Sequence, residues 1–169
     1  TFDHLLFSKL PKMNYNIIDM MKHFKDDQKI LPQCIQLLSL RCSQNKTEKF
    51  SCRPQTKKEQ TSIVEAIVDC LNSTQTIVRL EALIGLDDIF NYTEKDSKLI
   101  DALRSNNLPF VFADQELQAI VLERVETCVH DPNNSIAKRA DVYFEHINSN
   151  ILTAQKYLNR NTTTNEKNA

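Results

Sequence analysis

The residue types that carry most metal and enzyme chemistry are scattered along this sequence. The histidines are far apart, at His4, His23, His130 and His146. Cys128 and His130 are close in sequence, but at this spacing two side chains of one helix point to different faces. Zinc sites need several ligands at short, recurring spacings. We therefore expect no metal site. Because no nucleophile lies in a recognisable motif, we expect a protein that is not an enzyme and uses no cofactor.

Glycine is almost absent, with a single residue at Gly85. Neither the G-x-G-x-x-G fingerprint nor a P-loop can be written with one glycine, which excludes Gly-rich nucleotide loops. Strand-and-turn architectures also depend on glycine, because their tight turns need positive φ angles. The composition therefore favours an all-helical fold.

The cysteines indicate a reducing compartment. There are five, an odd number, and no C-x-x-C occurs among Cys34, Cys42, Cys52, Cys70 and Cys128. Several of them fall on the apolar faces of predicted helices, where a free thiol behaves as a small buried hydrophobe. Disulfides persist in oxidising compartments. We therefore expect buried free thiols and an intracellular location, cytoplasmic or nuclear.

Charge and hydropathy point to neither nucleic acid nor membrane. The formal net charge is −1, so no overall field attracts a polyanion. No apolar run approaches the roughly 20 residues of a membrane span, and no signal-like N-terminus is visible. The chain begins with Thr1 and not with Met, which fits either a processed form or a fragment of a larger protein.

Apolar residues recur with the helical period of about 3.6 residues between polar turns, which predicts an all-α chain. We expect helices over residues 2–10, 14–24, 30–42, 59–71, 76–90, 93–104, 114–130 and 135–158. Residues 1–159 should form one helical-repeat domain with a polar loop at 43–58. The last residues, 160–169, have no apolar side chains to bury and should be a disordered tail.

Three of the predicted helices begin in the same way, with a polar turn followed by a large, a small and a large residue at positions i, i+4 and i+8. The residues are Ile30, Cys34 and Leu38 after KDDQ, Val78, Ala82 and Leu86 after NSTQ, and Ile136, Ala140 and Phe144 after DPNN. A small central residue lets two helices cross closely, and a short turn makes them antiparallel. The helix over 76–90 is apolar almost all round, which predicts cover on several sides.

The stretches NSTQTIVRLEALIGL and DPNNSIAKRADVYF resemble the turn and second helix of HEAT and armadillo-type repeats. Val78, Arg79, Ala82 and Leu86 match that pattern, whereas Ala137 stands where the second stretch would have arginine. The resemblance is best over about 60–144. It implies stacked antiparallel helix hairpins in a HEAT/armadillo-like α-solenoid segment. The alternative is a compact helical bundle.

The resemblance also implies roles for surface residues. Arg79 would pair with an acidic residue of the next repeat, with a partner contact as the alternative. Lys138, Arg139, Glu145 and His146 should face solvent on the last helix. They become candidate partner-binding residues if the second helices line a concave face, as the resemblance implies.

A local excess of basic residues lies in the segment 46–59. It contains Lys46, Lys49, Arg53, Lys57 and Lys58 against Glu48 and Glu59. Such a segment can contact phosphates or an acidic partner, and it can equally be a solvated loop. Lys57 and Lys58 are the candidate partner-binding residues here.

Together these features predict a protein–protein interaction module or a scaffold segment that binds another protein or a peptide segment through its helical-repeat surface. The alternative is a nucleic-acid-associated helical domain that uses the basic 46–58 loop. A third interpretation is a structural piece that links other domains and has no partner of its own. The sequence does not define an oligomeric state.

Overall fold

A computed structural model describes residues 10–25, 27–42, 56–90 and 110–166 of the chain, and all of its regular secondary structure there is helical. The six α-helices are α2 (Leu10–His23), α3 (Ile30–Cys42), α4 (Lys57–Asp69), α5 (Thr76–Phe90), α7 (Gln115–Val129) and α8 (Asn134–Glu166). Two 3₁₀ helices join them, η1 (Cys70–Asn72) and η2 (Phe110–Phe112). The all-α prediction is confirmed for the described residues. Residues 2–9 of the first predicted helix and all of the helix predicted at 93–104 lie outside them.

Side-chain caps explain where two of the helices begin. Thr56 Oγ1 accepts a hydrogen bond of 3.1 Å from the backbone N–H of Glu59 and so starts α4. Asp114 Oδ1 accepts one of 3.1 Å from the N–H of Leu117 and starts α7. Each cap satisfies a backbone donor that the first helical turn leaves without a partner.

Several predicted boundaries differ from the structure. Helix α2 begins at Leu10, so the helix start predicted at residue 14 and the helix end predicted at residue 10 are both wrong. Helix α4 begins at Lys57, so the polar loop predicted at 43–58 is wrong at its end, and Lys57 and Lys58 belong to the first helical turn. Residues 43–55 lie outside the described part. Helix α8 continues through Glu166, past the domain end predicted at residue 159. Residues 167–169 are not described.

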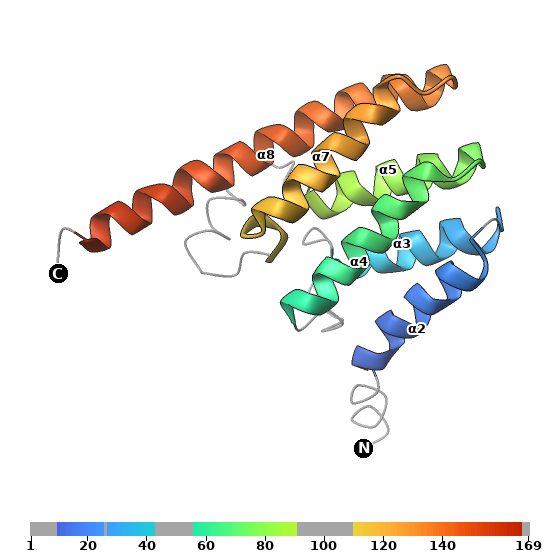
Figure 1. Cartoon of the computed structure of the whole chain (residues 1–169), viewed down its shortest axis with the longest axis horizontal. Coiled ribbons are helices and arrows are strands. Elements are labelled where there is room, and N and C mark those ends of the chain that lie inside the picture. Colours follow the sequence, from blue (N-terminus) through green and yellow to red (C-terminus); the bar gives the residue numbers. More distant parts are fainter. Residues whose placement is uncertain (1–9, 26, 43–55, 91–109, 167–169) are drawn as a thin grey trace.

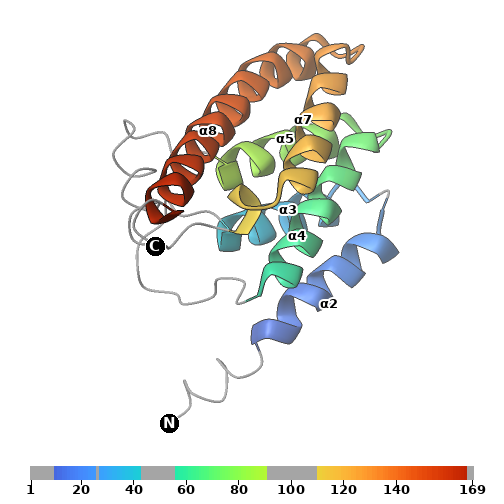
Figure 2. The same cartoon turned by 60° about the vertical axis from the view of Figure 1, so that its left-hand side comes forward.

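The helices are arranged in two rows. Short turns connect α2 to α3 and α7 to α8, and η1 with a short turn connects α4 to α5. Among the first helices, α2 packs against α4 and α4 against α7. Among the second helices, α3 packs against α5 and α5 against α8. Figures 1 and 2 show the two rows lying on each other, with the middle pair, α4 and α5, between the other two.

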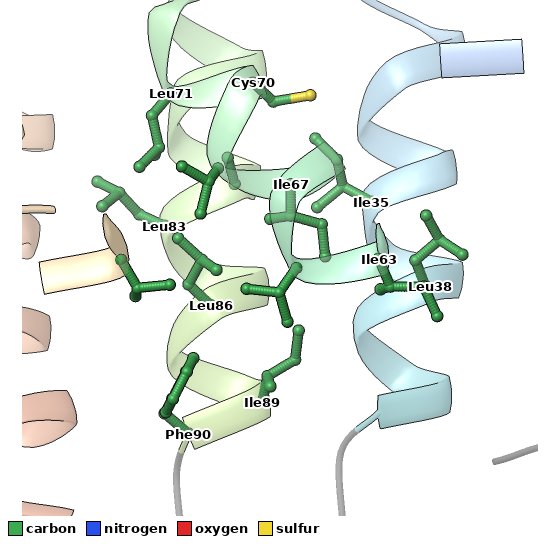
Figure 3. Close-up of a cluster of buried hydrophobic side chains, with 14 of the residues drawn as sticks. Ile35, Leu38, Ile63, Ile67, Cys70, Leu71, Leu83, Leu86, Ile89 and Phe90 are labelled. Carbon is green, nitrogen blue, oxygen red and sulfur yellow. The ribbon is translucent and has the colours of Figure 1, made fainter. Parts of the chain in front are cut away.

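Helix α5 lies at the centre of the hydrophobic core. Leu83, Leu86, Ile89 and Phe90 on this helix are buried, and Figure 3 shows them among buried side chains of α3 and α4. The Phe90 ring makes an edge-to-face contact with Phe112 of η2, with centroids 5.5 Å apart. Neighbours therefore cover α5 on several sides, as its apolar sequence predicts.

The three i, i+4, i+8 stripes face the core. Buried members come from all three, namely Cys34 and Leu38, then Val78, Ala82 and Leu86, then Ile136 and Ala140. Ile30 and Phe144 are partly buried and pack against the same core. The stripes thus mark the inner sides of α3, α5 and α8, which are the three helices of the second row.

Candidate interaction surface

Arg79 joins the second hairpin, α4–α5, to the third hairpin, α7–α8. Its Nε donates to Asp131 Oδ2 at 2.7 Å and its Nη2 to Asp131 Oδ1 at 3.1 Å. Its Nη1 donates to the carbonyl oxygens of Ser73 at 2.8 Å and Thr74 at 3.2 Å. Arg79 thus has the acidic partner that was expected for it, and the partner is Asp131, in the turn between α7 and α8. The Arg79 side chain is only 13% exposed and that of Asp131 7%, so we assign Arg79 a structural role and base no partner contact on it.

The pair also changes the titration of Asp131. Burial is the largest single influence and raises the pKa of the carboxyl group. The hydrogen bond from Arg79, the bond of 2.8 Å from the backbone N–H of Asn133 and the charge of Arg79 act in the opposite direction. Together they outweigh burial, so the pKa of Asp131 lies below its ordinary value.

Buried polar side chains join the helices of the first row. Asn14 Nδ2 of α2 donates to Glu59 Oε1 of α4 at 2.5 Å. The next residue, Gln60, accepts a bond of 3.2 Å from the backbone N–H of Val111. Asn14, Glu59 and Gln60 are all buried, and a misplaced helix would leave such groups without partners. The first bond therefore fixes how α2 and α4 fit together, and the second fixes η2 on α4.

The same kind of contact continues to the last hairpin. Gln118 Nε2 of α7 donates to the carbonyl oxygen of Val111 at 2.8 Å, and Gln155 Nε2 of α8 donates to Gln118 Oε1 at 2.9 Å. The buried hydrogen bonds of Asn14, Gln60 and Gln118 are not predicted from the sequence. A polar residue at a core position of an apolar helix indicates a buried hydrogen bond. It does not show which residue is the partner.

Exposed apolar side chains occur on each helix of the second row. Leu37 and Leu40 of α3, Ile77 of α5 and Val142 of α8 are between 41% and 49% exposed. We call these four residues the second-helix face. Single exposed apolar residues are common, and we take these four, on three neighbouring helices, as the candidate contact residues for another chain.

The candidate residues of α8 lie around Val142. Lys138, Arg139, Glu145 and His146 are all exposed, as the sequence predicts. Arg139 and His146 share a side of the helix with Val142, since the spacing is i, i+3 and i+7. His146 Nδ1 lies 3.7 Å from Asp87 Oδ1 of α5, which places this side toward α5.

Lys57 and Lys58 do not belong to the same site. Lys57 Nζ forms an ion pair of 3.2 Å with Asp114 Oδ2, next to the start of α7, and the lysine side chain remains 59% exposed. Lys138 and Arg139 lie near the start of α8, beside the other end of α7 (Figure 1). A helix of this length separates its ends by about 20 Å, so one small contact cannot cover both pairs. Lys46, Lys49 and Arg53 lie outside the described residues.

The structure also describes the residues that could bind a metal ion, the cysteine thiols and the apolar character of the helices. Across the described ranges, no group of three His, Cys, Asp or Glu side chains is placed to hold a metal ion. Cys34, Cys42, Cys70 and Cys128 are buried free thiols, as predicted. Burial is the main cause that raises the pKa of Cys42 and of Cys70 to about 12. No helix in the described part is long and apolar enough to cross a membrane.

Comparisons with known protein families, with curated proteins and with solved structures found no significant match to this chain.

Proposed function

We propose that this chain is a protein-interaction module with a HEAT/armadillo-like arrangement of helix hairpins, and that it binds a protein or peptide partner on the second-helix face. The observation that carries the proposal is the exposure of Leu37, Leu40, Ile77 and Val142 on three neighbouring helices of one row. Interface centres are depleted in charge and enriched in large side chains, with polar groups at the rim. Arg139 and His146 beside Val142 fit that rim.

The order of packing supports the HEAT/armadillo-like interpretation over a compact bundle. Each hairpin packs on its neighbour in the chain through both rows, α2–α4–α7 and α3–α5–α8. The Arg79–Asp131 pair joins a second helix to the turn of the following hairpin, which is the role that the resemblance implies for this arginine. A row of second helices gives a partner a continuous surface to bind.

Replacing apolar residues of the second-helix face tests the proposal directly. The full chain serves as bait in a cell extract, retained proteins are identified by mass, and the affinity of each purified candidate is then measured. Leu40→Asp with Val142→Asp should weaken binding of the true partner at least about tenfold, because a charge at an interface centre must be desolvated. Lys138→Glu with Arg139→Glu should weaken it less, about twofold to fivefold.

The matched control is Met20→Asp on α2, which replaces a 45% exposed residue of the first row. It introduces the same charge on another surface and should leave the affinity unchanged. A partner that binds both variants of the second-helix face as tightly as the unchanged chain would refute the proposed surface. Strong binding to RNA or DNA that falls steeply with salt would instead favour the nucleic-acid alternative.

A further inference from the structure

A cavity of about 380 Å³ lies between the first two hairpins, at the end of the molecule where the turns are. Its apolar lining includes Ile18 and Met21 of α2 and Leu31 of α3, all buried. Cys70 of η1, directly after the C-terminal end of α4, lines another side, and Figure 3 labels this residue. Cavities of this size with mostly apolar walls and a few polar groups are typical of sites for small molecules.

The residues at this corner explain why the space is open. Leu31 follows Ile30 in α3 as Arg79 follows Val78 in α5, and Ser73 precedes Val78 at the same distance as Asp131 precedes Ile136. Between the second and third hairpins, Arg79 and Asp131 fill the corner with an ion pair. Between the first and second hairpins, Leu31 and Ser73 both line the cavity instead. The two shorter side chains cannot bridge the hairpins, so the corner stays hollow and apolar.

The polar rim of the cavity carries a net positive charge. Lys22, in the last turn of α2, and Lys25, just after it, both line the cavity, and Asp69 is the acidic residue of the lining. Both lysines are exposed, so they belong to the solvent-facing rim of the cavity and not to its buried wall. The C-terminal end of α2 lies at the cavity, and its free carbonyl groups disfavour an anion there. An anion would therefore be attracted only by Lys22 and Lys25.

We propose that this cavity binds a small amphipathic carboxylate, with its aliphatic part against Ile18, Met21 and Leu31 and its carboxylate group at Lys22 and Lys25. An apolar chain gains free energy from the buried walls, and a carboxylate is the group that two lysines at the mouth select. The Cys70 thiol donates a hydrogen bond of 3.3 Å to the carbonyl oxygen of Ala66, so it takes part only as an uncharged wall. This site is separate from the second-helix face, and its test does not depend on the protein partner.

Decanoate is the probe and decanol is its uncharged control. Methyl signals of Ile18 and Met21 in the isotope-labelled full chain should shift saturably with decanoate, and decanol should bind about threefold to fivefold more weakly. Lys22→Glu with Lys25→Glu should weaken decanoate binding about tenfold and leave decanol binding unchanged. Lys58→Glu, an exposed charge reversal at the opposite end of α4, is the matched control and should bind decanoate like the unchanged chain.

Filling the corner tests whether the cavity itself is the site. Leu31→Arg with Ser73→Asp introduces the pair found at the next corner and should abolish decanoate binding, and Ala66→Leu offers a second way to fill the space if that variant does not fold. Saturable shifts that survive in the filled variants would place decanoate elsewhere and overturn the proposal. Absence of shifts with either probe would make the cavity a packing defect, and equal affinities for decanoate and decanol would overturn the carboxylate class.

Discussion

Gly85 of α5 lies so close to Ile35 of α3 that a Cβ atom at this glycine would stand 3.0 Å from Ile35 Cγ2 and 3.3 Å from Ser39 Cβ. The single glycine of the chain thus stands at a close approach of two packed helices, inside a helix where glycine is otherwise unfavourable. Because Gly85 has no side chain, the backbones of α5 and α3 can lie close together in the second row.

Gly85→Ala should therefore destabilise the protein. Intrinsic helix propensity alone favours alanine by about 1 kcal/mol, but the added methyl group must displace Ser39 Cβ, which is fixed to the backbone. Overpacking of a filled core typically costs about 1–3 kcal/mol. We expect a net loss of about 1 kcal/mol in the free energy of unfolding, measured by urea denaturation, and a larger loss for Gly85→Val. A gain in stability for Gly85→Ala would show that α3 and α5 do not approach this closely.

Breaking the Arg79–Asp131 pair should cost more than breaking an exposed pair. Both side chains are largely buried, so Asp131→Asn leaves the arginine charge without its partner, at a cost of about 2–3 kcal/mol. Lys57 and Asp114 form the matched control, since the Lys57 side chain is mostly exposed, and Lys57→Met should cost less than about 1 kcal/mol. A double-mutant cycle for each pair measures the coupling. Equal coupling energies in the two pairs would contradict the structural role of Arg79.

The lowered pKa of Asp131 predicts how stability changes in acid. A carboxyl group with a lower pKa in the folded state than in the unfolded state stabilises the fold above its unfolded pKa, near 3.9. That contribution is lost as the pH falls from about 4 through the folded pKa. Unfolding curves between pH 6 and about pH 2 should therefore show a shallower loss of stability for Asp131→Asn than for the unchanged chain. Parallel curves would mean that Asp131 titrates normally in the folded state.

The sequence predicts the helices that pack by regular apolar stripes. The bounds of α3 and α5 agree with the ranges predicted from spacing, because Val78, Ala82 and Leu86 repeat with the helical period and polar turns flank them. The resemblance to HEAT-type repeats also implied an acidic partner for Arg79, and the structure identifies it as Asp131. The helix bounds depend on local sequence, and the Arg79–Asp131 pair depends only on adjacent hairpins, so both can be predicted.

Other features depend on contacts that a single stretch does not reveal. Helix α4 begins earlier than predicted, since Thr56 and Glu59 have capping-box spacing, whereas the adjacent lysines favour a loop. The bond from Asn14 to Glu59 requires α2 and α4 to be neighbours. The cavity beside Leu31 is open because the side chains of Leu31 and Ser73 are too short to bridge the first and second hairpins. No local sequence pattern predicts such a cavity.

The buried thiols should react slowly in the folded protein. Thiolate is the reactive form, and a pKa of about 12 for Cys42 and for Cys70 leaves almost none near pH 8. In a Cys52→Ser background, an aromatic disulfide reagent should modify the remaining thiols at least about a hundredfold more slowly in buffer than in denaturant. Rapid modification in buffer would show that these helices open readily.

The distance between α2 and α7 distinguishes the stacked arrangement of hairpins from a compact bundle. Neighbouring helices pack with their axes about 8–10 Å apart, and α4 lies between α2 and α7. Spin labels at Asn16 of α2 and Glu123 of α7, both exposed, should therefore lie roughly 20–30 Å apart in a pulsed dipolar measurement. The slowly reacting native thiols allow selective labelling of introduced cysteines in the Cys52→Ser background. A distance near 10 Å would mean that α2 and α7 pack directly, as in a closed bundle, and would exclude the second-row surface as the proposed partner site.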